Sequence, residues 1–359
     1  MTSEDTGLTP LKSKSGGHPE PNLAQDVFGQ ISQVANKILE PICKYLCYAA
    51  AIMTLLMSLA MVVDLVSRLM FNSPLSGMIE LQTFMLVFMA FFSIAYTMIK
   101  NQHVSVDLIT SKMPACVNNI VQAILHIWGT FIFAAMSWLN ADRALEAFRR
   151  DEISDIIRMP YGYMYAAVTL GTLLMAFVLL TNLLSHLSWL YQNYKQRGAF
   201  WIILLGVFIL AGCGMFSGLM LKMIAPDLSS PAIGIGYTVF LMVILLLGFP
   251  VGFSMAFAGL TGLFYLIGSE VAFNVTKINT YDAVAVYFFV VIPFFLLMGF
   301  LILHAGIGAK LYNAGIKVFG RLPGGLAVGT VAGCGGGSPQ FVEIVLPRQL
   351  QWDRFRFLR

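Results

Sequence analysis

Long apolar runs separated by short polar segments dominate the chain from residue 43 onward. A helix needs about 20 residues to cross a hydrocarbon core of about 30 Å. We therefore expect eight membrane-spanning helices, at 43–71, 78–99, 118–141, 159–187, 200–222, 231–248, 251–268 and 284–303. Only Phe249 and Pro250 separate the sixth run from the seventh, which predicts either two short spans or one re-entrant hairpin. We favour two spans.

Polar segments divide these runs into units. Residues 1–41 are rich in Ser, Gly and Pro and predict a polar tail, with a short surface helix near 30–40. Residues 42–187 predict a four-helix unit, and residues 188–230 a hinge and a connecting helix. In residues 231–334, Gly and Pro occur inside the apolar runs. This is typical of closely packed or broken membrane helices, so we expect a second membrane unit there.

Composition fixes the class of protein. Hydrophobic residues make up 58% of the 359 residues and charged residues 11%, and the mean hydropathy is +0.78. A soluble domain carries about 25% charged residues, and the strands of a membrane β-barrel would alternate apolar and polar positions. We therefore predict an all-α polytopic membrane protein in contact with membrane lipids. This composition excludes an ordinary soluble enzyme, a disordered chain and a nucleic-acid-binding protein, and we do not expect an enzyme.

The distribution of basic residues predicts the orientation. Placing the N-terminus in the cytoplasm assigns most Lys and Arg of the connecting segments to the inside, as membrane proteins prefer. Segment 142–158 is the exception, because it mixes Arg with Asp and Glu. We expect a solvated external loop with internal ion pairs there.

Three charged residues fall within or beside predicted spans. Asp64 and Arg68 lie four residues apart, on one helix face, and Glu80 begins the second span. Charges in the membrane reach the interface, pair between helices or serve transport. We favour the first two roles and expect an Arg68–Glu80 contact across the hairpin.

Two histidines and five cysteines are candidate ligands of a haem or a metal ion, and neither set predicts such a site. His126 lies about 12 Å into its span, at 1.5 Å per residue, whereas His186 lies near the end of its own span. Because these depths differ, we set aside a haem held by paired histidines. The cysteines lack metal-ligand spacing, and we read them as buried thiols: Cys43, Cys47, Cys116, Cys213 and Cys334.

Several segments resemble the TRAP transporters, the tripartite secondary transporters that depend on a periplasmic binding protein. The four-helix unit resembles the small membrane subunit in Glu80, which opens the second span, and in the run 101–109, which closes it. Within that run, His103 and Asp107 resemble the family's His-x-x-x-Asp segment. Three later segments resemble motifs of the large membrane subunit. They are Gly248-Phe249-Pro250-Val251 for Gly-x-Pro-Val, Pro293 to Gly299 for Pro-x-Phe-x-x-x-Gly, and Gly320 to Leu326, with Pro323, Gly324 and Gly325, for Gly-x-x-Pro-Gly-Gly-Leu.

The resemblance implies fused membrane subunits of a symporter in the bacterial inner membrane. It implies uptake of small organic acids delivered by a periplasmic solute-binding protein, with sodium as coupling ion and no other cofactor. It also implies a scaffold formed by the small unit and an elevator-type transport domain in the large one. An alternative is a non-transport scaffold that docks the binding protein or a separately encoded large subunit. Neither reading names the solute.

The resemblance stops after Cys334. Gly335-Gly336-Gly337-Ser338-Pro339 interrupts a helix that begins at Gly324, and a charged tail follows. Codons shifted by one base across this tail permit Phe-Ala-Ala-Ile-Cys-Gly-Asn-Ser-Leu-Ala-Thr-Ala-Ala, close to the Gly-Ser-Ser-x-Ala-Thr-Ala-Ala segment of the family. We expect a frameshift near codons 334–337, an out-of-frame tail at 335–359 and a truncated chain. Such a chain lacks most substrate and ion ligands and is inactive by itself.

Overall fold

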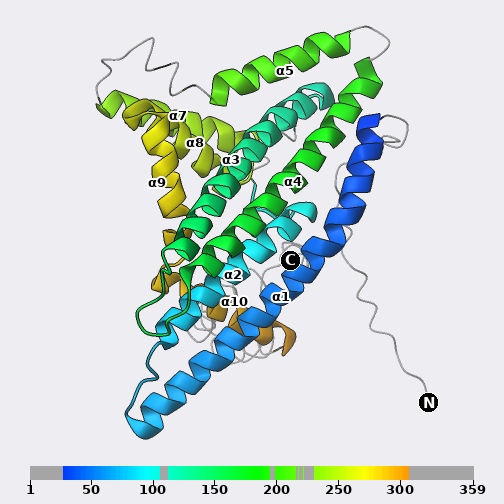
Figure 1. The fold of residues 1–359 in the computed structure, drawn as a ribbon. Helices are drawn as coiled ribbons and strands as arrows, with labels where there is room; N and C mark the ends of the chain where they lie inside the picture. Colours follow the sequence, from blue (N-terminus) through cyan, green and yellow to red (C-terminus); the bar gives the residue numbers. More distant parts are fainter. Residues whose placement is uncertain are drawn as a thin grey trace, which may run out of the picture. The chain divides into compact units, whose positions relative to one another are not determined.

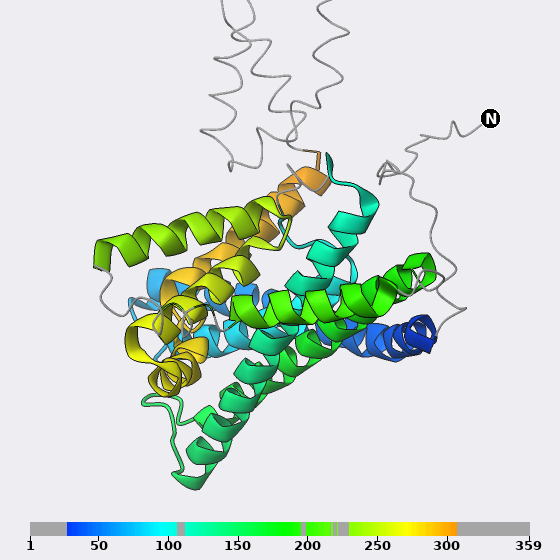
Figure 2. The same ribbon diagram turned by 90° about the horizontal axis from the view of Figure 1, so that it is seen from above.

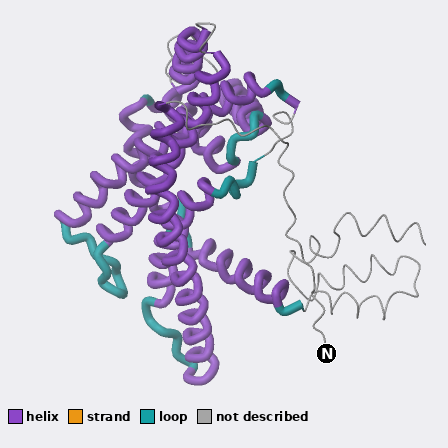
Figure 3. Tube along the Cα trace, turned by 90° about the vertical axis from the view of Figure 1, so that its right-hand side faces the viewer, coloured by secondary structure: helices purple, strands orange, loops and turns teal. Residues whose placement is uncertain are grey.

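The computed structural model describes residues 27–105, 112–194, 199–215 and 230–306, together with Ser217 and Leu221. Within these residues every regular element is a helix (Figure 3). The elements in order are α1 Val27–Phe71, α2 Met78–Ile99, α3 Ala115–Arg149, α4 Tyr161–Tyr194, α5 Ala199–Met215, α7 Ser230–Leu246, α8 Val251–Ile267, α9 Ser269–Asp282, the 3₁₀ helix η4 Tyr287–Val290 and α10 Val291–His304 (Figure 1). The all-α class predicted from composition is confirmed.

Helices α1 to α4 are long and apolar enough to cross a membrane, with 45, 22, 35 and 34 residues. Helix α2 matches its predicted span at both ends. Helix α1 runs unbroken through Pro41, so the short surface helix expected near residues 30–40 is part of it. Helix α3 continues to Arg149, into the segment predicted as a loop, because Ala, Leu, Glu and Arg favour helix there.

The next three helices are short. Helices α5, α7 and α8 have 17 residues each, or about 26 Å at 1.5 Å per residue. The Tyr237 hydroxyl of α7 donates a hydrogen bond to the Thr261 carbonyl of α8 at 3.1 Å, so these two helices pack against each other. With 17 residues each, α7 and α8 reach the lower limit of a membrane-spanning helix, so two short spans, which we favoured, and a re-entrant hairpin both stay predictions.

Residues 269–282, predicted as a connection, form helix α9. The chain then bends by 45° into η4 and α10, and Figure 2 shows this change of direction between the gold and orange helices. If the bent pair counts as one broken span, the described residues hold five candidate spans, and the shorter apolar helices α5, α7 and α8 lie where the other three of the eight expected spans were placed.

The chain divides into two compact units, which we describe separately. The first contains the described residues up to Pro41, residues 101–133 and residues 175–269; the second contains residues 42–100, 134–174 and those from Glu270 onward. Helices α1, α3 and α4 contribute to both. Helices α3 and α4 lie side by side (Figure 1). In the second unit the Ser137 hydroxyl donates to the Thr169 carbonyl at 3.2 Å.

Each unit has its own apolar core. In the first unit the core lies between α3, α4 and α5, and its buried members are Ala123, Leu183, Leu187, Leu190 and Val207. In the second unit the core joins α2, α3, α4 and α9, and its buried members are Phe84, Val87, Phe91, Ala144, Ala147, Met164, Tyr165, Val168 and Tyr281. Helix α9 is therefore part of the second core, although its own sequence is largely polar.

Candidate functional site

Asp64 and Arg68 form an ion pair on α1, as their spacing predicts. The Asp64 side chain is buried, and its Oδ2 atom lies 2.7 Å from Arg68 Nη2. Its Oδ1 atom accepts a hydrogen bond from the Leu75 N–H at 3.1 Å. Both oxygens are therefore engaged, and the carboxylate fixes the turn between α1 and α2.

Glu80, at the start of α2, holds the loop between α3 and α4. Its carboxylate accepts hydrogen bonds from the Ser154 hydroxyl at 3.1 Å and from the Ile157 N–H at 3.0 Å. The expected Arg68–Glu80 contact is therefore wrong. Arg68 instead bonds to the carboxylate one helical turn away, whereas Glu80 accepts hydrogen bonds from backbone N–H groups of the loop between α3 and α4.

Two segments that resemble family motifs meet in the first unit. The Val251 N–H, at the start of α8, donates a hydrogen bond to the Val104 carbonyl at 3.1 Å. The rings of His103 and Phe253 lie 5.1 Å apart, centroid to centroid. We call this contact the motif junction. It satisfies one of the N–H groups that every helix leaves unpaired at its start.

The turn before α8 explains why Gly and Pro stand in this motif. Gly248 has a φ of +80°, a left-handed conformation that glycine adopts at little cost. Pro250 immediately precedes α8, where its missing N–H costs no helical hydrogen bond. Between them, the fully buried Phe249 fixes the turn in the first unit.

Trp128 of α3 strengthens the motif junction, and sequence reasoning missed it. Its ring stacks on Phe257 of α8, with centroids 4.2 Å apart and an interplanar angle of 11°. Its Nε1–H donates to the Ala211 carbonyl of α5 at 2.8 Å. Phe residues dominate the aromatic content of the chain, and nothing in the sequence marked this indole among them.

His126 and His186 lie side by side in the first unit, with ring centroids 5.1 Å apart. The predicted difference in depth is therefore wrong, because it ignored the pairing of α3 with α4. His126 Nδ1 lies 2.7 Å from the Gln122 carbonyl, and His186 Nδ1 lies 2.9 Å from Asn119 Oδ1. The rings thus form a polar contact between the two helices.

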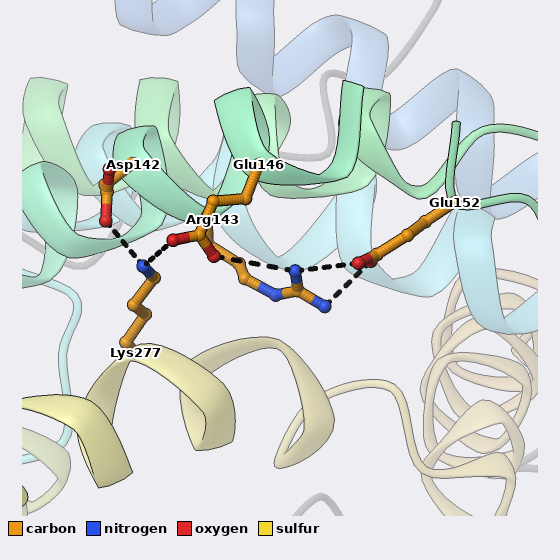
Figure 4. A network of polar contacts seen from close by, with 5 residues as sticks. All are labelled: Asp142, Arg143, Glu146, Glu152 and Lys277. Carbon is orange, nitrogen blue, oxygen red and sulfur yellow. Dashed lines mark hydrogen bonds and ion pairs between the residues drawn. The ribbon is translucent and has the colours of Figure 1, made fainter. Parts of the chain in front are cut away.

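A charged cluster joins α9 to α3 in the second unit (Figure 4). Lys277 Nζ lies 2.5 Å from Asp142 Oδ2 and 2.9 Å from Glu146 Oε1. Arg143 forms two hydrogen bonds to Glu152, at 2.8 and 3.1 Å. The ion pairs predicted within 142–158 are confirmed, whereas the partner from α9 was not foreseen. We call the contact of Lys277 and Tyr281 with α3 and α4 the charged junction.

Pro293 and Gly299 are buried on α10. Pro293 is the third residue of that helix, where proline is tolerated. It lines an apolar groove of about 510 Å³ together with Thr54, Leu86, Met89 and residues of η4 and α10. The remaining predicted positions, Asp107, Pro323, Gly324, Gly325 and the tail 335–359, lie outside the described residues.

Comparison with known families matches two parts of the chain. Residues 57–188 match the model described as "Tripartite ATP-independent periplasmic transporters, DctQ component". Residues 238–337 match the model described as "Tripartite ATP-independent periplasmic transporter, DctM component". Together the two ranges cover well over half of the chain. The motif junction and the charged junction each join the DctQ-matched range to the DctM-matched range.

Two relatives agree with these matches. A Haemophilus influenzae protein named as a TRAP transporter small permease is 25% identical over 166 residues, which are 45% of this chain and 96% of that protein. The isethionate TRAP transporter permease protein DctMQ of Oleidesulfovibrio alaskensis is 22% identical over 262 residues, which are 71% of this chain and 37% of that protein. The chain therefore belongs to the TRAP transporter permeases and carries a DctQ-type small unit fused to part of a DctM-type large unit.

Proposed function

We propose that this chain is the membrane component of a sodium-coupled TRAP transporter for small organic anions. The motif junction carries the proposal. There, the loop after α2 supplies the carbonyl that pairs with the first N–H of α8. A loop of the small unit thus completes the helix start that carries the Gly-x-Pro-Val motif of the large unit. This contact supports the proposal that the two matched ranges act together as one permease component.

The proposed substrate is a small carboxylate or sulfonate delivered by a periplasmic solute-binding protein. The carboxylate follows from the family resemblance. A sulfonate is added because the Oleidesulfovibrio relative is named for isethionate. The excess of basic residues in the segments assigned to the inside supports a cytoplasmic N-terminus in the bacterial inner membrane. Labelling of single cysteines from either side of the membrane tests this orientation.

We further propose that residues 335–359 are translated out of frame and that this chain alone does not transport. The DctM match ends at residue 337, inside the window of codons where the shift is expected. The tail that follows is charged and contains Pro347, so its sequence does not continue the apolar helix that the sequence predicts from Gly324. Sequencing the gene from codon 320 past the stop codon tests the frame directly.

The transport test compares this chain with a version whose frame is restored by one base. Each is reconstituted in vesicles with its solute-binding protein and offered labelled isethionate or a mixture of labelled small carboxylates. We expect sodium-driven accumulation by the frame-restored version and none by this chain. Accumulation by this chain would contradict its proposed inactivity. If accumulation by the restored version did not depend on the sodium gradient, sodium coupling would be contradicted.

A non-transport scaffold is the second candidate. The contacts between the DctQ-matched and DctM-matched ranges in the described residues are packing contacts, which a scaffold also needs. Retention of the solute-binding protein by both versions, without flux through either, would favour this role.

A further inference from the structure

Helix α9 presents two unlike side chains on one face toward the DctQ-matched range. Lys277 and Tyr281 are four residues apart, which places them one above the other on a helix. The Lys277 side chain is only 13% exposed, although lysine is among the residues most often solvated. Tyr281 is 5% exposed and belongs to the second core.

The opposing surface on α3 and α4 complements both side chains. Asp142 and Glu146 are also four residues apart, and both reach the Lys277 ammonium group. Without that cation, two carboxylates at this spacing would repel each other. The ring of Tyr281 packs beside Tyr165 and Tyr161, with centroids 5.0 and 6.1 Å away.

Arg143 contacts both the acidic part and the tyrosine part of this surface. Its guanidinium group lies 5.0 Å from the centroid of the Tyr165 ring and forms two hydrogen bonds to Glu152. It also lies 3.8 Å from Glu146, on the side away from Lys277. Contacts within α3, α4 and their loop thus position one member of each pair, Glu146 of the acidic pair and Tyr165 of the tyrosine pair.

We propose that Asp142, Glu146, Tyr161 and Tyr165 form a recognition socket for one kind of partner helix, a helix with a lysine and an aromatic residue four positions apart. In this chain α9 supplies that helix. Partly exposed ion pairs add modest affinity but discriminate strongly against a like charge. The socket therefore decides which large-subunit helix a small unit accepts. This inference depends on the family assignment and not on transport activity.

Hydrogen exchange in the full-length protein tests the socket. The variant Lys277→Glu sets a third carboxylate against Asp142 and Glu146, and we expect the amides of α9 to exchange at least about tenfold faster. Adding Asp142→Lys and Glu146→Lys to Lys277→Glu inverts the charges and restores most of the protection. The control is Arg150→Glu, which changes an exposed residue one position beyond the end of α3 and leaves α9 unchanged.

The amides of α8 serve as the internal reference, because α8 belongs to the first unit. Faster exchange in α8 as well as α9 would report general unfolding. In that case, the comparison of Lys277→Met with Lys277→Glu decides whether the effect arises from charge. Recognition by charge predicts that the neutral methionine is tolerated better than glutamate. Unchanged exchange in Lys277→Glu, or no rescue by the inverted pair, would overturn the proposal.

Discussion

The two junctions join the same two sequence ranges by different chemistry. In the motif junction a backbone hydrogen bond and stacked rings make the contact, and no charged side chain takes part in the contacts described there. In the charged junction an ammonium group lies between two carboxylates beside a cluster of tyrosines. The apolar contact supplies stability through buried area, whereas the ionic contact supplies selectivity.

The largest effect should come from Phe253→Ala in the motif junction. Phe253 is 5% exposed and packs against Phe133 as well as His103, with centroids 4.9 Å apart for the phenylalanines. Its loss leaves a cavity and should lower the free energy of unfolding by about 3–5 kcal/mol. Thermal unfolding in detergent measures the change. Phe288→Ala is the matched control, because Phe288 is 76% exposed, and a control as damaging as Phe253→Ala would refute the assignment.

A smaller effect is expected from Tyr281→Ala in the charged junction. The ring is buried in the second core, so its removal should cost about 2–4 kcal/mol. Tyr281→Phe keeps the ring and should differ little from the parent chain. If Tyr281→Phe were as unstable as Tyr281→Ala, the hydroxyl group rather than ring packing would be responsible.

A substitution in the turn of the motif junction should lower the free energy of unfolding by less. Gly248→Val places a β-branched residue at a φ of +80° and should cost about 1–2 kcal/mol. Gly252→Ala is the control, because a methyl group there would meet no atom within 4 Å. Equal stability of Gly248→Val and the parent chain would show that the turn has another conformation.

Salt should produce the smallest difference between the two junctions. Raising the ionic strength from 0.1 to 1 M shortens the screening length from about 10 to about 3 Å. The amides of α9 should then exchange slightly faster, by less than about fivefold, because a partly exposed pair contributes about 1 kcal/mol or less. The amides of α8 should not respond. A larger response in α8 would contradict the apolar description of the motif junction.

The two junctions also show which features of the molecule could be predicted from the sequence and which could not. The four long helices were predictable because each contains an apolar stretch long enough to cross a membrane. The Gly-Phe-Pro turn and the His103 segment were predictable because glycine, proline and family motifs mark positions locally. Their contact was not, because residues 103 and 253 are distant in sequence and nothing local pairs them.

Helix α9 was missed because its sequence is too polar to register as a membrane element. Lys277 of α9 lay in a segment predicted as a connection, far in sequence from segment 142–158, so their shared cluster could not be foreseen. The Arg68–Glu80 contact failed for a related reason. Sequence placed both charges near the same surface, but it could not show that Asp64 and the loop at Ser154 offered better-placed partners.

The central claim is that the small and large units are held together by these contacts and not only by the chain between them. A protease site inserted between Tyr194 and Ala199, outside the described residues, permits a cut after purification of the full-length protein. The account predicts that the two pieces of the cut protein stay together in detergent, and that they separate when Phe253→Ala is combined with Lys277→Glu. Separation of the cut parent protein under the same conditions would contradict it.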